Sequence, residues 1–134
     1  MKKITLIVFG LLVLFLIPAC NSGSDDDLFS ITSINPADGA TNVPLNQTIT
    51  VEFNYDLNWD TIALYEDFYL INTETSQLVD GTLFQGSANT ILFIPDSELS
   101  ADTTYNIFVD ATIEDIYGDI FSTSSTTSFT TVSE

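Results

Sequence analysis

Hydrophobic and polar residues alternate in two stretches of the chain, strictly so in the first. Residues 47–53 have their apolar positions at Ile49, Val51 and Phe53. Residues 104–111 repeat the pattern, with inward positions at Tyr105, Ile107, Val109 and Ala111. A period of two puts alternate side chains on opposite faces of a strand, so each stretch predicts a β-strand with one buried face.

Short runs rich in β-branched and aromatic residues predict further strands. The expected strands cover residues 29–34, 47–53, 67–71, 77–84, 90–94, 104–111 and 125–131. Residues that favour turns separate them at 35–39, 80–81, 95–96 and 117–119. A helical turn is expected over residues 57–64, because Leu57, Thr61 and Leu64 share a face. Seven short strands at near-regular spacing predict an all-β, antiparallel sandwich.

The first twenty residues are organised as an export signal. Two lysines follow the first methionine, residues 4–17 are almost wholly apolar, and Ala19 precedes Cys20, the only cysteine. An ordinary signal peptide ends in a small-residue cleavage site and needs no cysteine, whereas this stretch resembles a bacterial lipoprotein signal with its lipobox. The resemblance implies that residues 1–19 are removed and that Cys20 is acylated. The alternative, an uncleaved membrane anchor, would need about 20 apolar residues to span a bilayer.

Residues 20–27 are expected to form an acylated, acidic and flexible tether. Residues 21–27 are polar and have no apolar surface to bury. Asn21 stands where some inner-membrane lipoproteins have a retaining aspartate, and residues 24–27 resemble the acidic export signal of lipoproteins on the outer face of the outer membrane. The expected location is therefore the cell outer membrane, lipid-anchored and surface-exposed. A linker without a signalling role is the alternative.

The charge of the chain excludes several classes of partner. It has 19 acidic and 2 basic residues, a net charge of −17 at pH 7, and both basic residues lie in the expected signal. The mature chain would have no Lys, Arg or His side chain, so it lacks the cations that neutralise nucleic-acid phosphates or attract anionic lipids. The acyl chains must then carry the membrane attachment, which two or more chains make stable. The acidity favours solubility and self-repulsion at a surface, with a dedicated acidic binding face as the alternative.

Five motifs follow one another between residues 34 and 131. They are INPADGATNVP at 34–44, ITVEF at 49–53, FIP at 93–95, LSADTTY at 99–105 and SFTT at 128–131. In this order they resemble the bacterial Ig-like domain family first associated with S-layer proteins. The resemblance implies an immunoglobulin-like β-sandwich over residues 28–132, usually a stalk, spacer or adhesion module. It also implies a tyrosine corner at Tyr105 and the family's Asp, Gly and Asn or Asp before the last strand at Asp115, Gly118 and Asp119.

Two groups of residues are candidates for binding. Tyr55 and Trp59, the only tryptophan, follow the strand at 47–53 and either cap the end of the sandwich or stack on a glycan. Glu114, Asp115 and Asp119 crowd the segment before the last strand. Carboxylate oxygens are hard ligands that suit Ca²⁺, so a weak calcium site is one hypothesis and a solvated loop is the other. No cofactor is expected to be required.

The mature chain lacks the side chains that most catalytic mechanisms use. Nucleophile–base pairs need His, Lys or a free thiol, and no pair of carboxylates stands out by spacing for glycoside hydrolysis. We therefore expect a non-catalytic, lipid-anchored surface protein that presents one Ig-like domain for adhesion or for binding a protein or glycan. The alternatives are a purely structural envelope component and a small accessory subunit of a larger surface complex.

Overall fold

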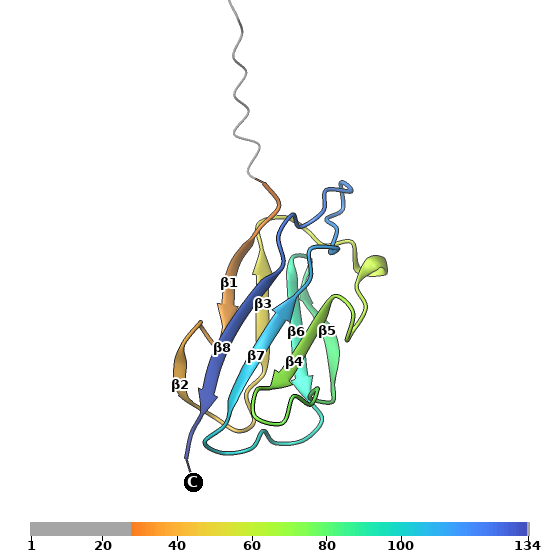
Figure 1. Cartoon of the computed structure of the whole chain (residues 1–134). Helices are drawn as coiled ribbons and strands as arrows, with labels where there is room; N and C mark the ends of the chain where they lie inside the picture. Colours follow the sequence, from red (N-terminus) through yellow and green to blue (C-terminus); the bar gives the residue numbers. More distant parts are fainter. Residues whose placement is uncertain (1–27, 134) are drawn as a thin grey trace, which may run out of the picture.

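In the computed structural model, which describes residues 28–133, eight strands form two sheets of four strands each (Figure 1). The first sheet has the strand order β1-β3-β6-β5 and the second has the order β2-β8-β7-β4. The strands are β1 (Ile31–Asn35), β2 (Ala40–Val43), β3 (Ile49–Phe53), β4 (Phe68–Asn72), β5 (Gly81–Ser87), β6 (Thr90–Pro95), β7 (Thr104–Val109) and β8 (Ser125–Thr131). A short 3-10 helix, η1 (Trp59–Thr61), lies within the expected helical turn. The predictions for the signal, Cys20 and the tether fall on residues 1–27, outside the described residues.

The predicted all-β sandwich is confirmed, but it has eight strands and not seven. The missed strand, β2, runs parallel to β8, with Ala40 opposite Phe129 and Val43 opposite Thr131. Its four residues are too few to show an alternation, and Asn42 within it adopts a left-handed φ of 55°. The other pairs of named strands are antiparallel. The second sheet is therefore mixed, and the predicted antiparallel arrangement does not extend to this edge.

The predicted strand over residues 77–84 is divided between the two sheets. Residues 77–79 extend the edge of β4, because Asn72 N donates to Gln77 O at 2.9 Å and Val79 N donates to Leu70 O at 2.8 Å. The chain then passes to the first sheet and continues as β5. The Asp–Gly pair at 80–81 marks the passage between the sheets.

The core lies between the sheets, where the alternating apolar positions face each other. Ile49, Val51 and Phe53 are at most 1% exposed, as the pattern predicts. The inward set on β7 is confirmed for its first three members, whereas Ala111 lies beyond the end of that strand and is half-buried. Residues 28–133 contain no Lys, Arg or His with which to form a salt bridge. Burial of apolar surface, the main favourable term in folding, therefore acts here without support from side-chain ion pairs.

Tyr105 forms the predicted tyrosine corner. Its side chain is 3% exposed, and its ring stacks on Phe129 with centroids 5.6 Å apart. Ser100 N donates to the Tyr105 hydroxyl at 2.9 Å. This hydrogen bond ties the connection between β6 and β7 to the strand that follows it.

The two ends of the described chain lie at opposite ends of the sandwich (Figure 1). We call one the N-terminal end, which comprises Leu28 and residues 54–61 and 110–124. The other is the distal end, which comprises residues 44–48 and 96–103. Within residues 28–133, no helix combines the length and apolar character that crossing a membrane requires.

Candidate binding surfaces

The candidate residues from the sequence gather at the N-terminal end. The two connections that meet there carry Tyr55, Trp59, Glu114, Asp115 and Asp119. Backbone hydrogen bonds join these connections, since Asn58 N donates to Glu114 O at 2.9 Å and Ile116 N donates to Asp56 O at 3.0 Å. The structure therefore brings the two predicted groups into one contiguous region, although they are far apart along the chain.

Asp115 organises the connection between β7 and β8. Its side chain is 1% exposed, and its Oδ1 accepts hydrogen bonds from Tyr117 N at 2.8 Å and Asp119 N at 2.9 Å. Gly118 has a φ of 88°, a left-handed conformation that glycine adopts without steric cost, and its N–H donates to Asp115 O at 3.1 Å. The Asp, Gly and Asp of this segment thus have a structural role in shaping the loop.

The structure does not assemble the predicted calcium site. In the described part of the chain, no group of three or more His, Cys, Asp or Glu side chains is arranged to hold a metal ion. Asp115 Oδ1 is already engaged by two backbone amides, while its Oδ2 is buried without a hydrogen-bond partner. Glu114 and Asp119 contribute backbone oxygens to the loop, which accept from Asn58 N and Asp115 N. Calcium binding stays a prediction without support from this geometry.

Asp115→Ala is expected to lower the free energy of unfolding by about 2 kcal/mol, because two partly buried amides lose their acceptor. Asp115→Asn retains an oxygen that can accept both hydrogen bonds, so we expect a loss of about 1 kcal/mol or less. Urea unfolding of both variants checks the difference. Equal losses, together with a melting temperature that rises with Ca²⁺ and falls with chelator, would instead show that the charge of Asp115 acts through a bound cation.

Tyr55 and Trp59 are both partly buried against the core. The Trp59 indole N–H is buried and has no acceptor. The Tyr55 ring meets Tyr117 edge-on, with centroids 6.3 Å apart and an interplanar angle of 90°. Packing of Trp59 against the core is what the capping interpretation requires. The exposed aromatic ring at this end is that of Tyr117, which is 74% exposed. The sequence analysis did not select Tyr117 as a binding residue.

A second surface, also missed from the sequence, covers the outer side of β4 and β7. Tyr69 and Phe108 lie opposite each other across these strands, and their rings stack with centroids 4.5 Å apart and an interplanar angle of 20°. Ile71 follows on the outward side of β4, and Leu78 is bridged to it and 47% exposed. We call Tyr69, Ile71, Leu78 and Phe108 the aromatic face. Phe108 carried a sequence signal, because it is a bulky aromatic at an outward position of the stretch at 104–111. Tyr69 lies in the continuous apolar run Phe68–Ile71, where no alternation separates the two faces.

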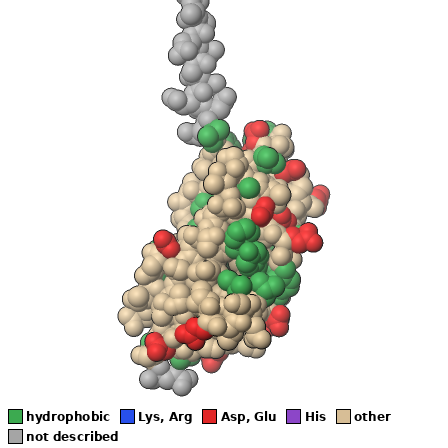
Figure 2. All heavy atoms as spheres, in the orientation of Figure 1, with side chains coloured by type: hydrophobic (Ala, Val, Ile, Leu, Met, Phe, Trp, Pro, Cys, Tyr) green, Lys and Arg blue, Asp and Glu red, His purple; other side chains and the backbone are tan. Residues whose placement is uncertain are grey.

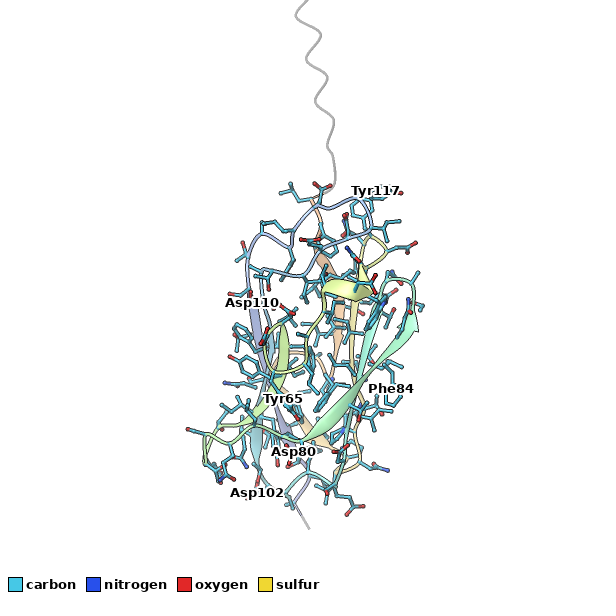
Figure 3. All side chains as sticks on the ribbon, turned by 90° about the vertical axis from the view of Figure 1, so that its right-hand side faces the viewer. Tyr65, Asp80, Phe84, Asp102, Asp110 and Tyr117 are labelled. Atoms are coloured by element: carbon cyan, nitrogen blue, oxygen red, sulfur yellow. The ribbon has the colours of Figure 1, made fainter. Side chains whose placement is uncertain are left out.

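Figure 2 shows hydrophobic side chains gathered over this side of the second sheet, with acidic side chains around them. Tyr65 and Asp80 lie near one another beside β4 (Figure 3), and the Tyr65 hydroxyl is 3.5 Å from Asp80 Oδ1. The aromatic face is therefore an apolar area on the flank of the sandwich with an acidic margin.

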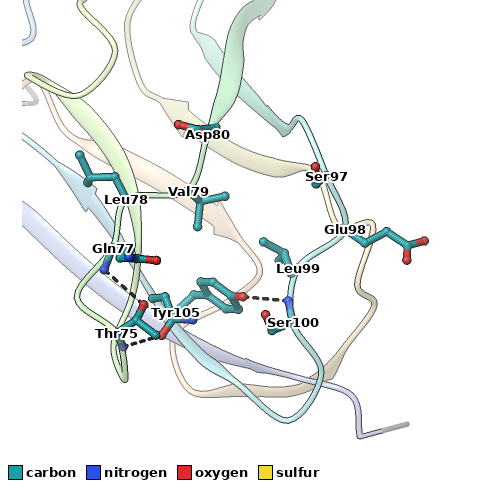
Figure 4. A pocket seen from close by; sticks show the side chains of 11 residues that line it. Thr75, Gln77, Leu78, Val79, Asp80, Ser97, Glu98, Leu99, Ser100 and Tyr105 are labelled. Atoms are coloured by element: carbon teal, nitrogen blue, oxygen red, sulfur yellow. Dashed lines mark hydrogen bonds between the residues drawn. The ribbon is translucent and has the colours of Figure 1, made fainter.

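A shallow pocket lies towards the distal end, between residues 72–80 and 97–100 (Figure 4). Its volume is about 300 Å³, and the residues that line it include Asp80 and Glu98. Tyr105 contributes to its lining while its hydroxyl accepts from Ser100 N. The pocket is wide enough for a small polar group, but it has no cationic side chain to bind an anion.

Comparisons with known proteins agree with this architecture. The bacterial Ig-like domain family matches residues 25–131. The S-layer protein SbsC, domains 1–6, superposes with a TM-score of 0.57 at 18% identity, over 78% of this chain and 14% of that one. CopC from Methylosinus trichosporium OB3b gives a TM-score of 0.60 at 12% identity, over 79% of this chain and 95% of that one. The LD-transpeptidase LdtMt1, solved in complex with imipenem, gives a TM-score of 0.56 at 15% identity, over 78% of this chain and 40% of that one.

These structural similarities concern the fold. The chain covers only a seventh of the SbsC structure but nearly the whole of CopC. The same sandwich is thus part of a larger protein in one case and almost the entire solved chain in another. No curated protein sequence matches the chain.

Proposed function

Since the chain belongs to the bacterial Ig-like domain family, we propose that it is a non-catalytic envelope protein that displays an Ig-like domain for adhesion or for binding a protein or glycan. A lipid on Cys20 holds it to the cell outer membrane, and the sandwich faces the exterior. The export signal, the single cysteine at its end and the acidic residues that follow support this location.

The observation that carries the binding role is the aromatic face. Apolar patches on the surface of soluble proteins mark interaction sites. In this patch Leu78 is 47% exposed, and Tyr69, Ile71 and Phe108 are half-buried on the outer side of the sheet. Stacked Tyr69 and Phe108 rings provide a broad apolar surface that loses little conformational entropy on binding, and the tyrosine adds a hydroxyl for a hydrogen bond. Because this face lies on the flank of the sandwich, attachment at the N-terminal end leaves it accessible (Figure 1).

The charge of the chain restricts the ligand. Acidic side chains surround the aromatic face (Figure 2), and no Lys, Arg or His follows Lys3. A polyanionic ligand would meet repulsion without a compensating cation. The surface therefore favours a neutral glycan or a neutral or basic protein segment, bound through apolar contact and hydrogen bonds.

The proposal is tested in cells that carry the wild-type chain, Cys20→Ser, or a double variant with Tyr69→Thr and Phe108→Thr. The matched control, Phe84→Thr with Ile94→Thr, removes exposed apolar side chains from the other sheet. We expect Cys20→Ser to leave the membrane fraction. The double variant should stay in that fraction and be removed by protease from intact cells, but lose binding on glycan and protein arrays, while the control binds normally.

Two outcomes would contradict the proposal. Retention of Cys20→Ser in the membrane fraction would exclude lipid anchoring through this residue. Absence of any array ligand for the wild-type chain, together with a weakened envelope in cells that lack the gene, would favour the purely structural role instead.

A further inference from the structure

Four exposed apolar side chains surround the point where the chain enters the sandwich. In residues 28–133, eight large hydrophobic side chains are exposed, and half of them lie at the N-terminal end. These are Leu28, Ile116, Tyr117 and Ile120, which are 76, 55, 74 and 58% exposed. We call them the apolar tip. Figure 3 shows Tyr117 at one end of the sandwich and Asp102 at the other.

Hydrogen bonds within the N-terminal end hold the loop of the apolar tip in place. The two amides that Asp115 binds belong to Tyr117 and Asp119, and Ile116 N donates to Asp56 O. Glu114 and Ile120 form a β-bridge across the loop. These hydrogen bonds order the loop that carries the outward side chains. The fold itself therefore holds these side chains exposed at this end.

The loop is also joined to the core by packing between aromatic rings. Phe121 packs edge-on against Phe29, with centroids 6.1 Å apart, and against Phe53, at 5.9 Å. Phe53 is a core residue and only 1% exposed. The apolar tip is therefore coupled to the core of the sandwich through these rings.

We propose that the apolar tip docks on the surface of the lipid bilayer that holds the acyl chains of Cys20. This inference rests on the proposed lipid anchoring. Seven residues, 21–27, separate Cys20 from Leu28, and even a fully extended chain of that length spans no more than about 30 Å. The tether therefore keeps the apolar tip within about 30 Å of the membrane that the anchor enters. Tethering makes the docking intramolecular, so a contact too weak to form from solution is populated.

The chemistry of the apolar tip matches the interface of a neutral bilayer. Tyrosine places an apolar ring and a polar hydroxyl at the level of lipid headgroups, and isoleucine and leucine bury apolar surface beneath them. Asp56, Glu114 and Asp119 at the same end would be repelled by anionic lipid. The preferred partner is therefore a surface of zwitterionic lipid, and anionic lipid should weaken the contact.

Docking would orient the whole sandwich. With the N-terminal end on the bilayer, the distal end points away from it, because the two lie at opposite ends of the fold (Figure 1). The aromatic face would then stand on the side of an upright domain, where a ligand in the medium can reach it.

The test uses the full-length acylated protein in phosphatidylcholine vesicles. A nitroxide label is attached at Asp119→Cys, beside the intact apolar tip, or at the exposed distal position in Glu98→Cys. Because acylation blocks Cys20, each variant has one reactive thiol. We expect the label at 119 to be several-fold less accessible than the label at 98 to a water-soluble nickel chelate, and more accessible to oxygen dissolved in the lipid. Adding anionic lipid should reduce this difference.

A second variant identifies the residues responsible. Replacing Ile116, Tyr117 and Ile120 by serine should make the label at 119 as accessible to the chelate as the label at 98. The control with Phe84→Thr and Ile94→Thr should keep the difference. Circular dichroism shows that each variant is folded.

The outcomes separate docking from anchoring. A protein that floats with the vesicles, but whose two labels are equally accessible to the chelate, overturns docking and leaves anchoring intact. A protein that does not float overturns the proposed lipid anchor. Protection of the label at 119 that appears only at high protein density would show that a second copy covers the apolar tip, and would overturn the lipid contact.

Discussion

Phe53→Ala is expected to lower the free energy of unfolding by about 4 kcal/mol, because it removes buried apolar surface and leaves a cavity that the core cannot fully close. Phe53 is 1% exposed at the end of β3. Its ring stacks on Phe29 with centroids 5.2 Å apart and meets Phe121 edge-on at 5.9 Å. Truncation therefore removes one ring of a cluster in which all three rings pack against one another.

Urea unfolding, followed by Trp59 fluorescence and by circular dichroism, measures this loss. The matched control is Phe84→Ala, since Phe84 is 48% exposed on β5. We expect this control to lose about 1 kcal/mol or less. Equal losses at the two positions would show that the three-ring cluster does not stabilise the fold in this way. Loss of the cluster should also loosen the loop that carries the apolar tip, because Phe121 packs on Phe53.

Gly81→Ala is expected to destabilise the protein by about 3 kcal/mol through steric overlap. A Cβ atom at Gly81 would lie 2.4 Å from Phe93 Cζ and 2.6 Å from the backbone oxygen of Ile94. Phe93 is fully buried, and the Ile94 oxygen belongs to the neighbouring strand β6. Neither atom can move away without disturbing the core or the pairing of β5 with β6.

Gly39→Ala is the control for the general cost of replacing glycine. No atom lies within 4 Å of a Cβ atom there, but Gly39 has a φ of 74°. The expected loss is about 1 kcal/mol, the strain of an L-residue in a left-handed conformation. The same urea experiment compares the two variants, and a smaller loss for Gly81→Ala than for Gly39→Ala would contradict the predicted overlap.

The losses of stability expected for Gly81→Ala and Phe53→Ala have different physical origins. A second substitution that relieves the first should therefore not relieve the other. A smaller side chain at position 93, such as Phe93→Leu, would relieve part of the overlap with an alanine at 81, because two of the three nearest atoms belong to the Phe93 ring. It could not restore the apolar contacts that Phe53→Ala removes from the cluster with Phe29 and Phe121. Adding Phe93→Leu to Gly81→Ala and to Phe53→Ala therefore distinguishes steric overlap from cavity formation.

Local sequence patterns predicted the parts of this protein that depend on local geometry. The alternation at 49–53 identified three core residues, because consecutive side chains of a strand must point to opposite faces. The tyrosine corner at Tyr105, which the family resemblance implied, is also a local feature, since the hydroxyl bonds to an amide only five residues upstream. The resemblance likewise implied Asp115, Gly118 and Asp119, which lie close together in the chain and shape a loop in the described structure.

The features that the patterns missed depend on contacts between distant segments. Strand β2 forms because Ala40–Val43 pairs with β8. Neither the length nor the composition of this segment indicates a parallel pairing. Tyr69 and Phe108 become one surface only through the register of β4 with β7.

The same holds for the apolar tip, which needs residue 28 and the loop at 116–120 at one end of the sandwich. The residues that face inward followed from the sequence, because the period of a strand is built into the backbone. The surfaces that could meet a ligand or a membrane were decided by the tertiary structure, because strand register and sheet order bring together residues that no local pattern relates.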